Sequence, residues 1–376
     1  MYVILLFALF FFTFSTMVGG NPRHDAYGFR YWDKPGPFAE YNSTGLLGRW
    51  EGFLACVWNA SFAVVGPEYL SMVAAEAKRP RSYIKAAYKT VYMRFGIFFI
   101  GSALCVGIVI AHNDPLLESI ARGNASGGGT AAASPYVIAM QNLGIDRFPH
   151  VVNALLCTSI FSAGNTYAYC ASRSLYSLAL SGRAPKIFTK CTTRGVPHYC
   201  LAVSMLFSIL AFLQVSTKTA NALSTLIGLV TSSAFINYII MSTTYVFWWQ
   251  ATKAQSFDRS KLPYKGWFQP YCAWVSLTFY ICVTGTYGYT SLRTWDAASF
   301  FGAYTMVILS PCLFFCWKIM TNSKMVKPEE ADLAWDAPIV DTYEASFTTP
   351  PVTFWVEMAQ LIGLKKTKNG NDQREV

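Results

Sequence analysis

The sequence predicts an all-α membrane protein, a polytopic helical bundle of about eight transmembrane helices. Of its 376 residues 53% are hydrophobic and only 13% are charged, about half the charged share of a soluble domain. Eight apolar stretches are long enough to cross about 30 Å of hydrocarbon as helices. These stretches are residues 1–18, 53–77, 95–112, 151–172, 199–215, 223–249, 271–291 and 299–317.

The first stretch, residues 1–18, is predicted to be a membrane span rather than a signal peptide. No basic residue precedes its apolar run, and that run of roughly 17 residues exceeds the core of a secretory signal. With the orientation derived below, the chain begins in hydrocarbon without a cytoplasmic lead-in. We therefore expect the amino end to be cut.

The second stretch, residues 53–77, interrupts its own helix. In FAVVGPEYLSMVAAEAKRP (62–80) a proline follows a glycine, and proline removes a backbone donor and clashes with the preceding turn. The sequence predicts unwinding at residues 65–67, where freed peptide groups need protein or a wet cavity as partner. Glu68 follows, and a charge at mid-bilayer costs about 2.5 kcal/mol or more. Two interpretations stay open: a discontinuous transport helix, or a proline kink whose glutamate pairs with a neighbouring helix.

Loop charge orients the helices, since cytoplasmic loops hold the excess of Lys and Arg. One set of alternate loops carries 15 basic residues, and the other, although longer in total, carries 8. The basic set, expected in the cytoplasm, comprises residues 78–94, 173–198 and 250–270. The set expected outside comprises residues 19–52, 113–150, 216–222 and 292–298.

Two Asn-X-Ser/Thr triplets, at Asn42 and Asn124, fall in the outer set and support the same orientation as glycosylation sites. The net charge of +10 then belongs to the cytoplasmic face and its anionic lipid. Membrane lipid is therefore an expected partner, and nucleic acid is not.

Polar residues inside the later stretches have competing interpretations. Ser159, Ser162 and Thr166 recur at near-helical spacing, as is typical of close helix packing. Asn237, beside Tyr238, lies in an apolar run, where it either bonds to a neighbouring helix or takes part in substrate binding or gating.

The composition does not favour an enzyme or a metal protein. Most of the ten cysteines fall within the predicted spans, where they read as small apolar residues. The four histidines lie at span ends or in loops without carboxylate or cysteine companions at useful spacing. No catalytic residue, metal or cofactor is therefore expected.

Two cytoplasmic segments complete the chain. RSYIKAAYKTVYMR (81–94) places Arg81, Lys85, Tyr88 and Lys89 at helical intervals, which predicts an amphipathic helix at the membrane surface. The tail, residues 321–376, mixes acidic residues with Pro, Thr and a basic end. It is predicted to be a mostly disordered cytoplasmic segment that trafficking machinery could read.

Four segments carry a resemblance to a known family. FAVVGPEYLSMVAAEAKRPRSYIKAAYKTVYMRF (62–95) resembles the sixth helix and following loop of fungal (YAT-type) amino-acid permeases, in the amino acid-polyamine-organocation (APC) superfamily. The loops after the fifth, eighth and tenth helices of that family resemble YGFRYWDKPGPF (27–38), SAGNTYAYCASRSLYSLALSGRAPKIF (162–188) and KAQSFDRSKLPYKGWFQPYCAW (253–274). The segments occur in the family's order and spacing.

The resemblance implies a 12-helix, inverted-repeat fold of the LeuT/APC type. Residues 1–320 would then be helices five to twelve, with helices one to four absent, and residues 321–376 the cytoplasmic tail. The implied function is secondary active transport of amino acids, with proton symport at the plasma membrane. A non-transporting amino-acid sensor of the same fold is the alternative.

The resemblance also implies site residues on the broken helix. Phe62 and Ala63 would line the site, the backbone of Val65 and Gly66 would contact the amino acid, and Glu68 would be a polar or proton-linked anchor. Val64 and Pro67 depart from the family pattern, which has an aromatic and a small polar residue there. In related transporters the eighth helix borders a cation site, so Ser159, Ser162 or Thr166 would contribute hydroxyls, and Asn237 would help to bind substrate.

Overall fold

The computed structural model describes residues 2–63, 66–77, 79–121, 134–215, 217–293, 295–335, 337–347 and 356. Within these residues all regular structure is helical. The chain divides into two compact units, each described here by itself. Unit 1 consists of Met1–Gly66 and Thr90–Leu223, and unit 2 of Pro67–Lys89 and Ser224–Val376.

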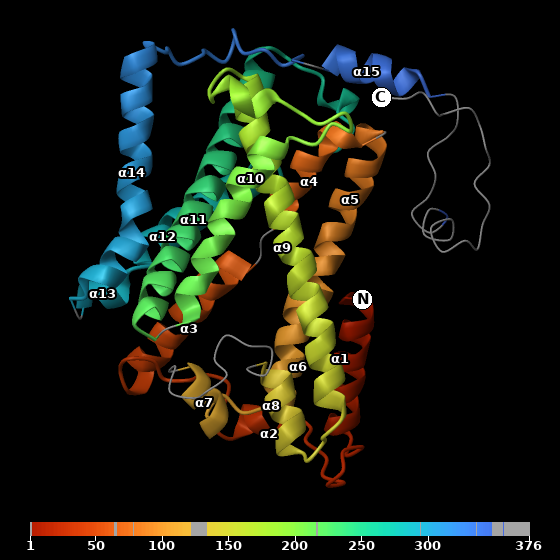
Figure 1. Cartoon of the computed structure of the whole chain (residues 1–376), viewed down its shortest axis with the longest axis vertical. Coiled ribbons are helices and arrows are strands. Elements are labelled where there is room, and N and C mark those ends of the chain that lie inside the picture. The colour runs from red at the N-terminus through yellow and green to blue at the C-terminus, as the bar shows by residue number, and fades with distance from the viewer. Residues whose placement is uncertain are drawn as a thin grey trace. The chain divides into compact units, whose positions relative to one another are not determined.

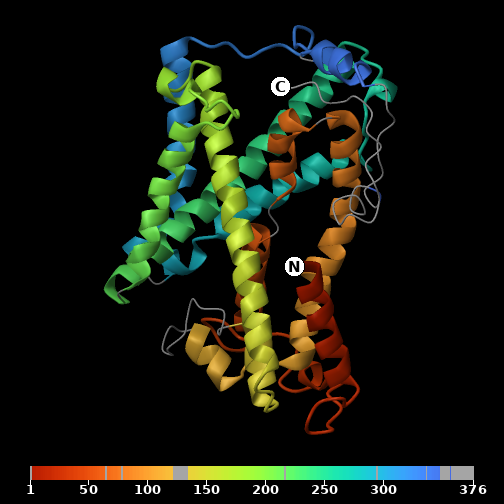
Figure 2. The same cartoon turned by 45° about the vertical axis from the view of Figure 1, so that its right-hand side comes forward.

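Helices occur in each of the predicted stretches, with different boundaries, and Figures 1 and 2 show them. Unit 1 contains α1 (Tyr2–Met17), α2 (Arg30–Asp33), α3 (Gly45–Ala63), α6 (Ser102–Val109), α7 (Pro115–Ala121), α8 (Pro135–Asn142), α9 (Phe148–Leu180) and α10 (His198–Leu206). Unit 2 contains α4 (Pro67–Val73), α12 (Tyr271–Thr286), α13 (Tyr289–Arg293), α14 (Ala297–Thr321) and α15 (Ala337–Ala345). The division between the units falls within α5 (Pro80–Phe95) and α11 (Thr217–Ala254).

Three helices in the described part of the chain are long and apolar enough to cross a membrane, namely Pro80–Val109, Thr225–Ala254 and Ala297–Thr321. Two shorter apolar helices are Ile4–Met17 and His198–Phe212. Helix breaks account for part of the difference from eight spans. The predicted stretch 53–77 is divided between α3 and α4, and α10 passes into a 3₁₀ segment, η5 (Phe207–Val215).

One boundary differs from the prediction. The segment 81–94 was expected to lie on the membrane surface, separate from a span at 95–112. The structure instead has one continuous helix from Pro80 to Val109, formed by α5, a π-helical stretch η2 (Gly96–Gly101) and α6. No proline or extended residue interrupts the chain between them, so the amphipathic and apolar parts join.

The core of unit 1 lies where α1, α6, α8 and the start of α9 run side by side (Figures 1 and 2). Its fully or nearly fully buried side chains include Leu5 of α1, Val109 of α6, Met140 of α8 and Val152 of α9. In lipid, helices associate mainly through van der Waals packing of such side chains. The apolar faces of these helices therefore hold unit 1 together.

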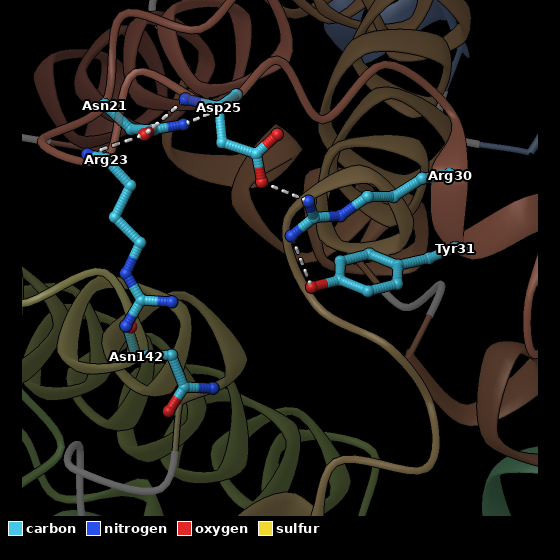
Figure 3. A network of polar contacts seen from close by, with 6 residues as sticks. All are labelled: Asn21, Arg23, Asp25, Arg30, Tyr31 and Asn142. Atoms are coloured by element: carbon cyan, nitrogen blue, oxygen red, sulfur yellow. Dashed lines mark hydrogen bonds and ion pairs between the residues drawn. The ribbon is translucent and has the colours of Figure 1, made fainter.

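A network of polar contacts stabilises the loop after α1 and links it to the end of α8, as Figure 3 shows. Asn21 Oδ1 accepts from the backbone N of Arg23 over 3.0 Å, and the Arg23 guanidinium donates to the carbonyl of Asn142 at the end of α8. Arg30 pairs with Asp25 and donates to Tyr31 Oη over 3.1 Å. Arg30 and Tyr31 belong to the 27–38 segment that resembles the permeases, so part of that segment has a structural role.

Arg30 also lies over the ring of the buried Tyr27, with its guanidinium carbon 3.4 Å from the ring centroid. Burial raises the pKa of the Tyr27 phenol, and the neighbouring Tyr31 adds to the shift. Tyr27 is therefore a neutral anchor under the arginine.

In unit 2, α11 and α14 approach each other closely at two glycines. A Cβ atom added to Gly228 would lie 3.4 Å from the backbone carbonyl of Gly302, and one added to Gly302 would lie 3.4 Å from Thr225. Small residues at a helix interface let backbones approach in this way.

The tail prediction is wrong for residues 337–345, which form helix α15 instead of a disordered segment. The reason is tertiary, because α15 is held by contacts with the start of α5. Residues 348–355 and 357–376 lie outside the described residues.

Candidate functional site

The helix break predicted at Gly66 and Pro67 is present. Helix α3 ends at Ala63 and α4 begins at Pro67, with proline at the first helical position, where its missing N–H costs nothing. Gly66 has φ of +128°, a conformation that L side chains rarely adopt. The local sequence therefore both ends one helix and starts the next.

Glu68 is the second residue of α4 and is only 9% exposed. Tyr238 Oη of α11 donates a hydrogen bond to Glu68 Oε1 over 2.9 Å. The Tyr238 ring stacks on Tyr280 of α12, with centroids 4.8 Å apart and an interplanar angle of 28°. The Glu68 carboxylate of α4 thus meets a tyrosine of α11 that is stacked on a tyrosine of α12, all within unit 2.

The aromatic group continues behind Tyr280. The fully buried Phe235, one turn before Tyr238, lies with its ring centroid 6.2 Å from that of Tyr280 and 5.3 Å from that of Tyr287. Aromatic pairs at such distances add to the stabilisation from buried area. The tyrosine that meets Glu68 is therefore supported by neighbouring rings.

A second contact joins α4 to α5. Ser71 Oγ donates to the carbonyl of Glu68 over 2.5 Å. The Tyr88 phenol of α5 lies beside Ser71 and Glu68. Glu68 is thus surrounded by groups from α4, α5, α11 and α12. Such a buried carboxylate with phenol neighbours can hold a proton, a cation or an ammonium group.

The other residues expected on the broken helix are only partly described. Ala63 is the exposed last residue of α3. Phe62 lies in the final turn of α3, but its side chain is outside the described part, as is the whole of Val65. Of the expected set, the structure gives side-chain geometry to Glu68 and backbone geometry to Gly66.

On α11 the residue that meets Glu68 is Tyr238, not Asn237. The Asn237 side chain is exposed, and its amide donates to Met241 Sδ over 3.7 Å, one turn along its own helix. Adjacent residues differ by about 100° around a helix, so only one of the two can face α4. A signal for Tyr238 existed in the sequence, because a tyrosine inside an apolar run needs a partner for its hydroxyl.

The proposed cation-site hydroxyls share one face of α9, a helix of unit 1. Ser159 is half-buried, Ser162 and Thr166 are exposed, and Thr166 Oγ1 donates to the carbonyl of Ser162 over 3.1 Å. The Thr166 hydroxyl proton is thus used within the helix. The lone pairs of its oxygen remain available to a cation.

The structure describes one of the two predicted glycosylation sites. Asn42 lies exposed in the loop before α3, with φ of +37°, and Asn124 falls outside the described residues. Among the residues that the structure describes, no group of three or more His, Cys, Asp or Glu side chains could hold a metal ion.

Comparison with known proteins gives a consistent result. The family model described as amino acid permease matches residues 1–328. The general amino acid permease AGP2 of Saccharomyces cerevisiae is 41% identical over 353 residues, covering 91% of this chain and 58% of that protein. The dicarboxylic amino acid permease of the same yeast is 34% identical, covering 91% of this chain and 56% of its own. The proline-specific permease of Emericella nidulans is 34% identical, covering 88% and 59%.

The chain therefore spans a little more than half the length of these curated relatives. No solved structure matches it.

Proposed function

Because the chain belongs to the amino acid permease family, we propose that it contributes helices five to twelve of a transporter that carries amino acids across the plasma membrane with protons. It is an integral membrane protein with a helical fold. The family consists of permeases, which confirms that the chain is not an enzyme.

The observation that carries this proposal is the buried Glu68 at the start of α4, bonded by Tyr238 directly after the helix break. Broken helices in inverted-repeat transporters place free backbone groups and helix ends at the substrate. We assign Glu68 as the proton-linked or ammonium-binding anchor. Tyr238 orients this carboxylate. Tyr88 of α5 supports α4 beside Glu68 and Ser71.

The family resemblance supplies the roles of the remaining site residues. Phe62 and Ala63 at the end of α3 line the substrate, and the backbone of Val65 and Gly66 contacts its ammonium or carboxylate group. Ser159, Ser162 and Thr166 of α9 supply hydroxyls to the coupling cation. We now give Tyr238 the role at Glu68 and leave Asn237 as a substrate contact or gating residue on the exposed face of α11.

In this proposal residues 1–320 are the transmembrane part and residues 321–376 the cytoplasmic tail. Asn42 and Asn124 face outside, where they can be glycosylated, and membrane lipid and trafficking machinery meet the cytoplasmic side. The relatives are named as permeases, which favours transport over the sensor alternative. In the same proposal, helices one to four of the family fold would supply the other broken helix.

Uptake measurements test the proposal in yeast cells that lack their own amino-acid permeases. Residues 1–376 alone are expected to give uptake no higher than the empty vector. A chimaera that joins the preceding part of the general amino acid permease AGP2 to this chain is expected to restore uptake that rises with an inward proton gradient. Strong uptake by residues 1–376 alone would refute the requirement for upstream helices.

Within the chimaera, Glu68→Gln keeps the shape of the side chain and removes its charge. We expect uptake to fall at least tenfold while surface expression is unchanged. Glu76→Gln is the matched control, because Glu76 is an exposed glutamate eight residues along the same segment. Normal rate and pH dependence in Glu68→Gln would instead make the carboxylate a structural partner at a kink.

A further inference from the structure

The start of α5 has a capping group that its own sequence does not supply. The first N–H groups of a helix lack partners within it, and Ser, Thr, Asp or Asn at the N-cap position commonly bonds them. Here Arg79 precedes the helix, and the side chain of arginine contains no hydrogen-bond acceptor. Its carbonyl accepts from Ser82 N and Tyr83 N over 3.1 and 2.9 Å. That leaves the N–H of Arg81, since Pro80 has none.

Glu344 of α15 supplies the missing acceptor. Glu344 Oε1 accepts a hydrogen bond from the Arg81 N–H over 2.7 Å, across 263 positions of sequence. A negative charge at a helix N-terminus also interacts favourably with the helix dipole. The tail helix therefore acts as the N-cap of α5.

Three further contacts hold α15 in this place. Arg81 Nη1 pairs with Asp341 Oδ1 over 2.7 Å, and Arg81 Nη2 donates to the carbonyl of Ala337 over 3.3 Å. The Arg79 guanidinium lies 4.8 Å from the ring centroid of Phe347. Asp341 and Glu344 are three residues apart and so share one face of α15. The ion pair is partly exposed and adds little stability alone. The four contacts together define one position for α15. Figure 1 shows α15 near the start of α5.

The chain just before α15 docks on a second helix. Gln255, immediately after α11, donates through Nε2 to the carbonyls of Pro328 and Ala331 over 2.9 and 2.7 Å. The tail thus contacts α5 and the end of α11. These are the helices that bring Tyr88 and Tyr238 to Glu68 and its neighbour Ser71.

We propose that residues 328–335 and 337–347 form a built-in clamp, in which α15 caps α5 and the preceding segment binds the end of α11, so that both helices are held in their arrangement around Glu68. Every contact in this argument lies within unit 2. The clamp is a property of the folded chain and does not depend on the transport proposal.

Hydrogen exchange of the full chain in lipid nanodiscs tests the clamp without measuring transport. Glu344→Ala removes the cap, and we expect exchange of the first-turn amides of α5 to become at least tenfold faster. Exchange in residues 68–76 is expected to rise as well, because α5 supports that segment through Tyr88. The matched control is Glu40→Ala, which removes the same charge from an exposed residue outside the proposed clamp and should leave both segments unchanged.

Cross-linking in membranes gives a second measurement. Arg79→Cys with Phe347→Cys is expected to react with a short bis-maleimide, and adding Glu344→Ala should lower the yield several-fold, with each single cysteine variant as control. Unchanged exchange and cross-linking in Glu344→Ala would overturn the docking. Faster exchange in α5 alone, with residues 68–76 unaffected, would overturn the clamp.

Discussion

Tyr238 Oη donates to Glu68 Oε1 over 2.9 Å, so a phenol of α11 holds the carboxylate in the first turn of α4. The two residues are 170 positions apart in sequence. Tyr238 is in turn stacked on Tyr280, which lets the hydroxyl be removed without removing the ring. This pair provides the most direct test of the site.

Tyr238→Phe should weaken the site without disturbing the aromatic stack. A hydrogen bond to a charged group contributes about 1.5–3 kcal/mol, which corresponds to roughly 10- to 100-fold in an equilibrium constant. We expect a loss of this order in the apparent affinity for amino acid, or a shifted pH dependence of uptake, in the AGP2 chimaera. Tyr271→Phe, which removes an exposed hydroxyl at the start of α12, is the control. If the two variants behave alike, Tyr238 does not position Glu68.

Gly66→Ala should destabilise the protein although space is open around the added carbon. No atom lies within 4 Å of a Cβ at Gly66, but its φ of +128° is strained for any L side chain, at about 1–3 kcal/mol. Gly164 of α9 also has open space and no positive φ, so Gly164→Ala should stabilise by about 0.5–1 kcal/mol. Thermal unfolding in detergent measures both. Equal effects of the same sign would contradict the role of backbone conformation.

Gly302→Leu should separate α11 from α14. Its Cβ would already lie 3.4 Å from Thr225, and the extra carbons of leucine would overpack the interface at a cost of about 1–3 kcal/mol. Gly285→Leu on α12 is the control, because a Cβ at Gly285 meets nothing within 4 Å. The midpoint of thermal unfolding should fall for Gly302→Leu and stay near the original value for Gly285→Leu. The reverse order would exclude the close approach.

Asp296 should make the start of α14 sensitive to acid. It accepts from the backbone N of Ala298 and Ser299, and a hydrogen bond from the Ser299 side chain lowers the pKa of Asp296 below its ordinary value. A carboxyl whose pKa is lower in the folded state stabilises that state above its unfolded pKa of about 3.9, and this contribution is lost as pH falls through the folded value.

Hydrogen exchange at Ser299 as a function of pH measures this effect. Protection should fall with acidification below about pH 3.9. Asp296→Asn keeps an acceptor at the cap position but does not titrate, so its protection should not change over the same range. A fall that persists in Asp296→Asn would assign the titration to another group.

The proposed orientation makes Lys190 cytoplasmic and Asn42 external. Lys190→Cys should react with an impermeant maleimide only after the cells are opened, and Asn42→Gln should remove a glycan detected by gel mobility. Arg49→Cys, at an exposed position near the start of α3 that the same orientation places outside, is the positive control for labelling of intact cells. Labelling of Lys190→Cys from outside would reverse the orientation and the helix numbering.

The local sequence accounts for the positions of many helices and for the helix break, without reference to tertiary contacts. Apolar runs predicted its helices, and the helix break follows from Gly66 and Pro67 alone, because a missing donor and a positive φ act on the backbone where they occur. The family resemblance was likewise readable from linear segments, and the permease match confirms it.

Tertiary structure alone decided which groups meet. Asn237 and Tyr238 are equally plausible partners in sequence, and the rotation of α11 selects Tyr238 for Glu68. Residues 337–345 were predicted to be part of a disordered tail, yet α15 forms, with Asp341 and Glu344 bonded to the side chain and N–H of Arg81. Such choices depend on contacts between residues far apart in the chain, and local propensity and periodicity contain no information about them.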